Sequence, residues 1–397
     1  MASSAEQIRA WKGPALLSYG FRPFFLGGAL WAALSMVLWI GLLAGWFELP
    51  TRFDPVSWHA HEFLFGYLGA IVAGFLLTAV PNWTGRLPLV GWSLAALFSL
   101  WIVGRVTIAL SGLSAPLLSA ALDLLMPVTL MLVLAREVVA GRNWRNAPVL
   151  LLLSVFIAGN AVFHWEVATG EYAASGLGVR IGLGAAVMMI ALIGGRIVPS
   201  FTHNWLKKQG ETRMPASFGL YDKLALLVLL GAVGAWIVTP HGPLAAWSLL
   251  LAGVLHLVRL ARWKGYLTLP DALVWVLHAG YATIPLGALV IAATTLLDLP
   301  FSAASSQHLW MAGGIGLMTL AVMTRATLGH TGHELVADII TSQLYLLVIV
   351  SVLARILVDL VPEFGMVFYQ LSGLCWVAAF GGFALSYGRK LVSPRRN

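Results

Sequence analysis

The sequence predicts an all-α membrane protein, a polytopic bundle of about 12 transmembrane helices, on three observations. Of the 397 residues, 59% are hydrophobic and only 10% are charged, whereas soluble domains carry about 25% charged residues. The mean hydropathy is +0.87. The apolar stretches are continuous and about 20 residues long, which is the length that a helix needs to cross a bilayer. A β-barrel would instead show alternation over about 10 residues.

Twelve apolar stretches leave no room for a soluble domain, so we expect one integral membrane domain over residues 1–397. At about 20 residues each they use about 240 residues, and the loops between them are short. The stretches cover residues 24–46, 60–80, 89–110, 118–139, 147–168, 174–198, 219–238, 244–262, 271–295, 307–328, 335–358 and 365–387.

The distribution of Lys and Arg predicts the orientation. With the N-terminus placed in the cytoplasm, only Arg52, Arg105, Arg180 and Arg355 of the 24 basic residues fall on the outer side. Basic residues favour cytoplasmic loops, so both termini are expected in the cytoplasm. The same rule accounts for the net charge of +8 without a nucleic-acid partner.

A weak internal repeat links the ends of the second, sixth and tenth stretches. Segments 78–84, 198–205 and 322–325 each combine Val or Pro with Thr and a polar residue, at a spacing of about four helices. The spacing predicts three four-helix units, although coincidence among apolar helices explains it equally well.

Ten histidines are the unusual chemical feature of this membrane sequence. Imidazole is a common ligand for haem iron and for copper, and an ionisable side chain inside a membrane needs a cavity, a partner or a ligand. On the outer side we expect His59, His61, His164, His241 and His308; on the cytoplasmic side we expect His203, His256, His278, His330 and His333. We assign no role to His241 and His256.

The segment Trp58-His59-Ala60-His61-Glu62 is the sharpest of these signals. Residues two apart point about 200° apart on a helix, so His59 and His61 cannot hold one ion from one face. They serve different centres, or one is a ligand and the other a hydrogen-bond partner, and Glu62 can orient an imidazole. The alternative is a solvated helix start with Asp54 or Ser57 as its cap.

Depth in the membrane suggests which histidines act together. His61 and His308 are both expected at outer helix ends, where they can ligate one haem from two sides, as on helices 2 and 10 of the twelve-helix haem–copper oxidases. That comparison is an analogy of fold only. His164 can complete an outer metal site. A single histidine at the membrane interface is the alternative for His164 and His308.

On the cytoplasmic side, segment 323–334 combines Arg325, His330 and two glycines that let the backbone approach a ligand. A guanidinium such as that of Arg325 or Arg196 suits a haem propionate. The alternatives are a tight loop with solvated histidines and ordinary placement of basic residues. His278 is a buried candidate, or simply makes a hydrogen bond between helices.

Five segments together resemble the NnrS family of membrane proteins, which contain haem and copper and are linked to the bacterial nitric oxide response. They are residues 19–25, 58–62 with 65–67, 74–79 with 82–85, 195–202 and 324–332, and they span nearly the whole chain. The resemblance implies twelve helices, haem b, copper and a location in the bacterial inner membrane. Asn82 and Trp83, with Glu62, are then expected around the cofactor ligands.

The leading hypothesis is a membrane protein that binds or metabolises nitric oxide and protects against nitrosative stress, with a role in denitrification. Whether it is an enzyme stays open. Reduction would need two electrons, from a quinol or a cytochrome, and two protons for each pair of nitric oxide molecules. The candidate proton carriers are Glu62, Asp123, Glu166 and Asp338, for which interfacial or helix-capping roles are the alternative.

A twelve-helix secondary transporter without a redox cofactor is the alternative function, since Gly-rich segments and repeats are typical of that class. A structural or assembly subunit of a respiratory complex is a third. The histidines favour the metalloprotein, and the discriminating observation is whether the purified chain contains a cofactor.

Overall fold

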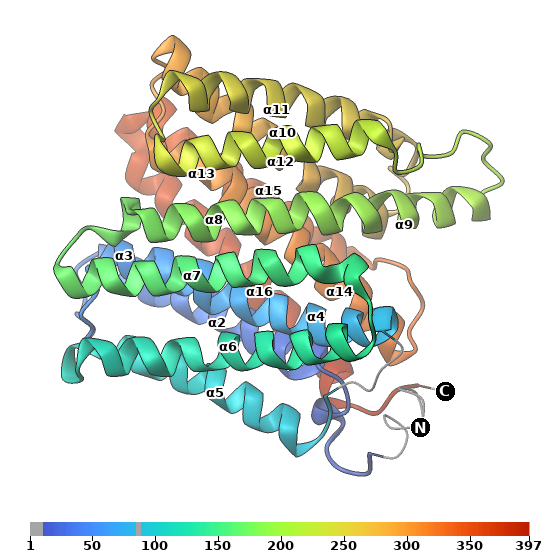
Figure 1. The fold of residues 1–397 in the computed structure, drawn as a ribbon, viewed down its shortest axis with the longest axis horizontal. Coiled ribbons are helices and arrows are strands. Elements are labelled where there is room, and N and C mark those ends of the chain that lie inside the picture. Colours follow the sequence, from blue (N-terminus) through green and yellow to red (C-terminus); the bar gives the residue numbers. More distant parts are fainter. Residues whose placement is uncertain (1–10, 85–88, 397) are drawn as a thin grey trace. The chain divides into compact units, whose positions relative to one another are not determined.

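The computed structural model describes the backbone of residues 11–84 and 89–396, and the side chains of these residues except 82–84. Within these residues the regular structure is entirely helical. Twelve helical spans are long and apolar enough to cross a membrane, which confirms the predicted fold class (Figure 1).

Nine of the twelve spans each contain one uninterrupted α-helix of at least 18 residues. They are α2 (Phe21–Leu43), α5 (Trp92–Ala109), α6 (Pro116–Ala140), α7 (Ala147–Thr169), α10 (Leu220–Val238), α11 (Pro243–Ala261), α12 (Ala272–Leu297), α15 (Ile339–Leu360) and α16 (Gly365–Val392).

The second, sixth and tenth spans differ because a π-helical segment interrupts each of them. Helices α3 (Pro55–His61) and α4 (Leu68–Thr84) flank segment Glu62–Tyr67, and α8 (Leu177–Met189) and α9 (Gly195–Lys208) flank segment Ile190–Gly194. Helices α13 (Ala303–His308) and α14 (Met318–Thr331) flank segment Leu309–Leu317. Short π-helical segments inside α-helices are rare and occur mostly at functional sites.

These three spans are also the least exposed. In their most apolar windows 78%, 67% and 78% of the residues are buried, whereas the other nine reach at most 61%. They are the spans that carry the weak sequence repeat. The expected division into three four-helix units remains a prediction.

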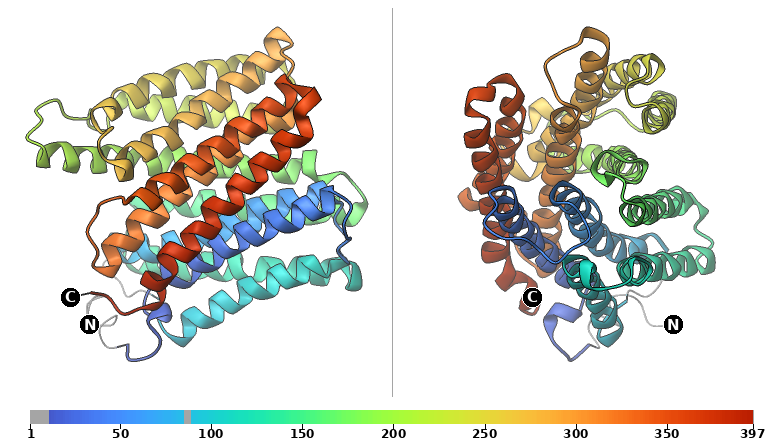
Figure 2. Two further views of the ribbon diagram at one scale, coloured as in Figure 1. Left: turned by 180° about the vertical axis from the view of Figure 1, so that it is seen from behind. Right: turned by 90° about the vertical axis from the view of Figure 1, so that its left-hand side faces the viewer.

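The chain forms two compact units. Residues 1–182, 326–333 and 380–397 make up the first unit, and residues 183–325 and 334–379 make up the second. In the first unit α5 packs on α6, α6 on α7, and α2 on α4 (Figure 1). In the second unit α10 packs on α11 and α11 on α12 (Figure 2). The single membrane domain expected over 1–397 stays a prediction.

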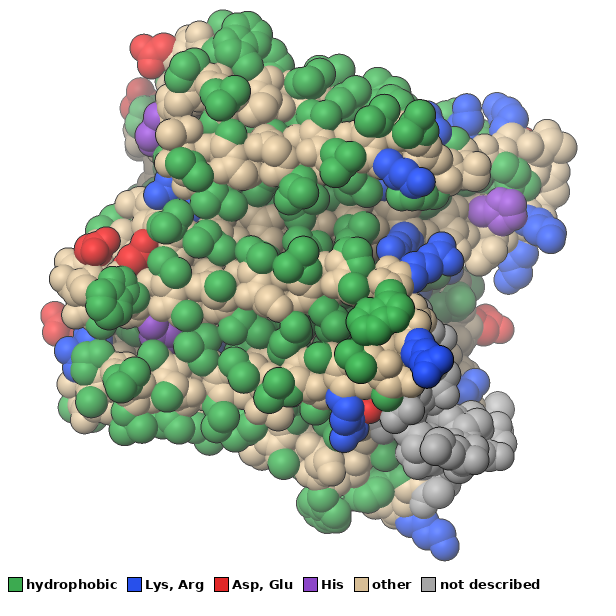
Figure 3. All heavy atoms as spheres, in the orientation of Figure 1, with side chains coloured by type: hydrophobic (Ala, Val, Ile, Leu, Met, Phe, Trp, Pro, Cys, Tyr) green, Lys and Arg blue, Asp and Glu red, His purple; other side chains and the backbone are tan. Residues whose placement is uncertain are grey.

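The outward faces of the helices suit a lipid environment. Figure 3 shows hydrophobic side chains along the lengths of the helices, with Lys and Arg gathered near helix ends. Leu117 is 81% exposed and Leu385 is 86% exposed. Apolar patches of this extent are rare on water-soluble monomers and mark a surface that meets lipid or another protein. The chain is therefore a multi-pass membrane protein.

Arg22 closes the first unit at one end of α2. It is only 3% exposed, and its Nη1 donates hydrogen bonds of 2.7 Å to the carbonyl oxygens of Leu391 and Ser393. The last carbonyls of a helix have no partner within the helix, and a positive charge there also complements the helix dipole. Arg22 thus caps α16 and ties it to α2.

We predict that Arg22→Ala lowers the free energy of unfolding by about 2–3 kcal/mol, because one buried and one partly buried carbonyl lose a charged donor. Thermal unfolding in detergent measures the change. Arg136→Ala is the control, since the Arg136 side chain is 71% exposed and forms an ion pair with its neighbour Glu137. Equal losses in both variants would contradict the capping role.

Candidate metal centre

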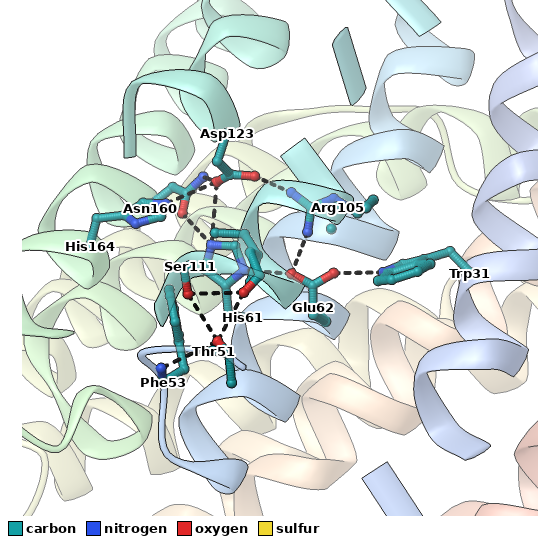
Figure 4. Close-up of polar contacts among 12 residues, drawn as sticks. Trp31, Thr51, Phe53, His61, Glu62, Arg105, Ser111, Asp123, Asn160 and His164 are labelled. Atoms are coloured by element: carbon teal, nitrogen blue, oxygen red, sulfur yellow. Dashed lines mark hydrogen bonds and ion pairs between the residues drawn. The ribbon is translucent and has the colours of Figure 1, made fainter. Parts of the chain in front are cut away.

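A cluster of buried polar side chains lies in the first unit, drawn from four transmembrane spans (Figure 4). His61 ends α3 and Glu62 begins the π-helical segment that follows. Arg105 comes from α5, and Asp123 comes from α6. Asn160 and His164 lie one helical turn apart on the same face of α7. All six side chains belong to residues that are at most 7% exposed.

Three of these residues have the geometry of a metal site. The Asp123 Oδ2 atom lies 3.3 Å from His61 Nε2 and 3.1 Å from His164 Nε2, and the three ligand atoms all lie within 4.8 Å of one another. Bonds of about 2.1 Å in tetrahedral geometry place ligand atoms roughly 3.4 Å apart. Small shifts therefore suffice for one ion to contact all three atoms.

Glu62 orients the imidazole of His61. A carboxylate accepts hydrogen bonds only, so the 2.9 Å contact makes His61 Nδ1 the donor to Glu62 Oε1. Glu62 is held in turn by Trp31 Nε1, 2.7 Å from Oε2, and by Arg105 Nη1, 2.6 Å from Oε1. A carboxylate behind a histidine is the usual support of a metal-ligating imidazole, and it aims Nε2 at Asp123.

The Nε2 side of His61 faces acceptors. Asn160 Oδ1 lies 3.0 Å from His61 Nε2, and Asp123 Oδ2 lies 3.3 Å from the same nitrogen. Asn160 Nδ2 donates a hydrogen bond of 2.8 Å to Asp123 Oδ2. A position lined by an amide oxygen, a carboxylate oxygen and a second imidazole nitrogen suits a proton or a metal cation.

The charges of the cluster are almost balanced inside the membrane. Arg105 donates through Nη1 to Glu62 and through Nη2 to Asp123, so that one guanidinium bridges two carboxylates. One negative charge remains if both histidines are neutral. Ionisable groups at this depth are costly to bury unless they pair or bind an ion.

Aromatic rings and close helix packing surround the cluster. The ring of Phe53 lies 5.2 Å from that of His61 and 5.8 Å from that of His164, and Phe163 lies 5.5 Å from His61.

A Cβ atom added to Gly178 would stand only 2.4 Å from the backbone nitrogen of Phe163. The missing side chain lets α8 approach α7 closely and so fixes the helix that carries His164.

The two histidines of segment 58–62 lie in different surroundings, as their spacing predicts. The ring of His59 stacks on Trp39 at 4.5 Å and lies 4.6 Å from Phe63, away from the cluster. Asp54 caps the start of α3, as the alternative interpretation expected, and His61 is nevertheless fully buried.

His308 lies in the second unit, so its pairing with His61 across one haem remains a prediction. Its Nδ1 donates to the carbonyl oxygen of Ala304 at 2.6 Å, which leaves the lone pair on Nε2. Like His61, it is the last residue before a π-helical segment.

The residues expected on the cytoplasmic side are spread over two units. The Arg325 guanidinium lies over the ring of Phe201 at 4.1 Å in the second unit, and Arg196 is half-buried at the start of α9. In the first unit, His330 stacks on Tyr19 at 5.3 Å. The side chains of Asn82 and Trp83 lie outside the described residues.

Length along the tenth span separates two of the expected cofactor contacts. Arg325 follows His308 by 17 residues, of which nine, Leu309–Leu317, are π-helical. In a regular α-helix 17 residues span about 25 Å. The two residues are therefore far apart along the span, and their contacts with a cofactor remain predictions.

Two of the candidate proton carriers cap helices, as the alternative interpretation expected. Glu166 accepts hydrogen bonds from the backbone nitrogens of Leu177 and Gly178 at the start of α8. Asp338 accepts from the backbone nitrogen of Thr341 at the start of α15. Asp123 and Glu62 belong to the cluster instead.

A second buried network, in the second unit, resembles the first but lacks a metal-ligand group. Arg259 donates to Asp222 at 2.9 Å and to the hydroxyl of Tyr281 at 2.7 Å, and that hydroxyl also contacts His256 Nδ1 at 2.8 Å. His278 bonds Thr202 of another helix at 2.7 Å, as its alternative interpretation expected. Among the described residues, the three-ligand group found is that of His61, Asp123 and His164.

Several members of the cluster are not evident from the sequence. Asp123 is expected only as a proton carrier, and Asn160, Arg105 and Trp31 are not expected at the site. The available signal is that Arg105 and Asp123 are ionisable residues inside consecutive apolar stretches, which favours an ion pair between neighbouring helices.

No curated protein is found to match the chain. The family model described as NnrS protein matches residues 15–395, which is nearly the whole chain and includes every member of the cluster. The protein therefore belongs to the NnrS family.

Proposed function

We propose that the protein is a haem- and copper-containing protein of the bacterial inner membrane that binds or metabolises nitric oxide and protects against nitrosative stress during denitrification. Family membership supports a role in the nitric oxide response. The observation that carries the proposal is the buried group of His61, Asp123 and His164, because two imidazoles and a carboxylate converge there in an apolar bundle.

We assign copper to this group. Two imidazole nitrogens and one carboxylate oxygen are donors that copper accepts, and the same set also suits iron(II) and zinc. His61 and His164 would bind through Nε2, and Asp123 through Oδ2. When bound, copper supplies a one-electron redox couple and a position for a small ligand. Metal analysis separates the three metals.

His61 is then a ligand of copper rather than of haem, since its Nε2 is aimed at Asp123 and its Nδ1 is bound to Glu62. We assign haem b to His308, whose Nε2 keeps the lone pair that iron requires. His330, which stacks on Tyr19, is the second candidate, with Arg325 and Arg196 as partners for propionates at the cytoplasmic end.

The residues around the site would favour binding of a small gas that dissolves in lipid. Nitric oxide dissolves in lipid and can reach a buried site without a polar channel. Phe53 and Phe163 exclude bulk water, which strengthens every charge interaction inside the cluster. Asn160 holds Asp123 in place through its amide. Glu62 holds the His61 ring through Nδ1 and is itself held by Trp31, so the imidazole keeps its orientation while a ligand binds.

One observation also supports a secondary transporter. The Arg105 bridge between Glu62 and Asp123 is a buried charge network of the kind that marks proton and substrate paths. A transporter needs no resident metal, so the metal content of the purified chain distinguishes the two functions.

We predict that the detergent-purified protein contains one copper ion per chain at the cluster. Asp123→Asn and His164→Ala are expected to lower copper at least tenfold, because each removes one of three ligands. Plasma mass spectrometry of protein purified by gel filtration measures the content. His203→Ala is the matched control, since His203 is exposed on α9.

Full copper in both ligand variants would contradict the assignment. Iron in place of copper, lost in the same variants, would keep the site but change its metal. A folded chain with no metal at all would favour transport.

We predict that the reduced protein shows a b-type haem spectrum that nitric oxide shifts, and that His308→Ala abolishes it. His241→Ala, which removes an exposed loop histidine, should leave the spectrum unchanged. Absorption spectra and the pyridine haemochrome assay measure both. A spectrum that survives in His308→Ala and disappears in His330→Ala would move the haem to the cytoplasmic end.

A further inference from the structure

Arg105 is the one member of the cluster whose charge is fixed. A guanidinium keeps its proton in proteins, and Arg105 is only 5% exposed. Within the described part of the chain, its hydrogen bonds go to carboxylates and not to a ligand nitrogen. Nη1 donates to Oε1 of Glu62, the same oxygen that accepts from His61 Nδ1, and Nη2 donates to Oδ1 of Asp123.

The contacts of Asp123 divide between its two oxygens. Oδ1 takes the hydrogen bond from Arg105, while Oδ2 is the oxygen directed at His61 and His164. Arg105 therefore acts on a bound metal ion only through the two carboxylates. Its role is to position them and to set the charge around the ion.

The charge of the protein groups follows from these contacts. Glu62 and Asp123 contribute two negative charges, Arg105 contributes one positive charge, and histidines that ligate a metal are neutral. The net charge of the groups around the ion is −1. A monovalent ion makes the buried cluster neutral, whereas a divalent ion leaves an unbalanced positive charge in an apolar interior.

We propose that Arg105 shifts this centre toward the cuprous ion, relative to the same three ligands without the guanidinium, and so disfavours cupric and other divalent ions. The inference rests on the proposed metal site and goes beyond it, because it names the direction in which the charge of the cluster shifts the copper couple and the residue responsible. Removing the guanidinium makes the net charge −2, which suits a divalent ion. Removing the negative charge of Glu62 makes it zero, which disfavours a divalent ion further.

The test is an anaerobic redox titration of the copper-loaded, full-length protein in detergent, followed by the paramagnetic resonance signal of Cu(II). In Arg105→Gln we expect the preference for Cu(I) over Cu(II) to fall at least tenfold, which is 59 mV in midpoint potential. In Glu62→Gln we expect a shift of at least this size in the opposite direction. Zinc should compete with copper more strongly in Arg105→Gln.

Two further variants separate charge from shape. Arg105→Lys keeps the charge but loses the planar fork, and the double variant Glu62→Gln/Arg105→Gln restores a net charge of −1. In both variants we expect the preference for Cu(I) over Cu(II), obtained from the midpoint potential, to stay within twofold of that of the unchanged protein. Arg355→Gln is the control for a buried arginine elsewhere, since Arg355 donates to Ser305 in the second unit.

The outcomes are distinguishable. A potential that falls equally in Arg105→Lys and Arg105→Gln, or that does not recover in the double variant, would overturn the inference in favour of geometry. If Arg105→Gln does not fold, Glu62→Gln against the double variant tests the same charge difference. A centre that holds no metal before any substitution overturns the proposed site itself, and the metal analysis reveals this before the titration.

Discussion

The bridge that Arg105 makes between Glu62 and Asp123 is the interaction on which the first unit depends. Three consecutive spans meet at that guanidinium, because its two nitrogens reach a residue of the second span and a residue of the fourth. A carboxylate in an apolar bundle is strongly unfavourable without a partner, and Arg105 is the permanently charged partner of both acids. The histidines take their orientation from those two acids, and the site geometry therefore follows from the charge balance.

The π-helical segments contribute the second constraint. A π-helical segment widens the helix and changes the direction in which the following side chains point, and it frees carbonyl groups that an α-helix would use. The segment Ile190–Gly194 offers the carbonyl of Ala191 to Arg259, 3.0 Å away. In the second and tenth spans the segment begins immediately after His61 and after His308. In both spans, therefore, a π-helical segment directly follows a histidine near the start of the span.

Much of the fold is predictable from the sequence, because hydropathy records the length of each span directly. The helix ends agree to within a few residues for spans such as α10, whereas the interruptions at Glu62, Ile190 and Leu309 have no hydropathy signal. The separate surroundings of His59 and His61 follow from helical periodicity alone. The convergence of Asp123, Asn160 and His164 does not, since it depends on which helices are neighbours. That information lies in side-chain complementarity between segments far apart in the chain.

The burial of the second span has a consequence for biosynthesis. Its window is 78% buried yet has a mean hydropathy of 2.1, among the highest of the twelve, although little of it faces lipid. Chains are made from the N-terminus, so Glu62 enters the membrane before Arg105 and Asp123 do. On insertion scales an acidic residue at the centre of a span costs about 3 kcal/mol, which is an upper limit for Glu62 near the start of its span, and each Leu, Ile, Phe or Val offsets roughly 0.3–0.6 kcal/mol. The many apolar residues of this span therefore suit a helix that is surrounded by lipid until the later spans are inserted. During that time Trp31 of the preceding span is the first partner available to Glu62.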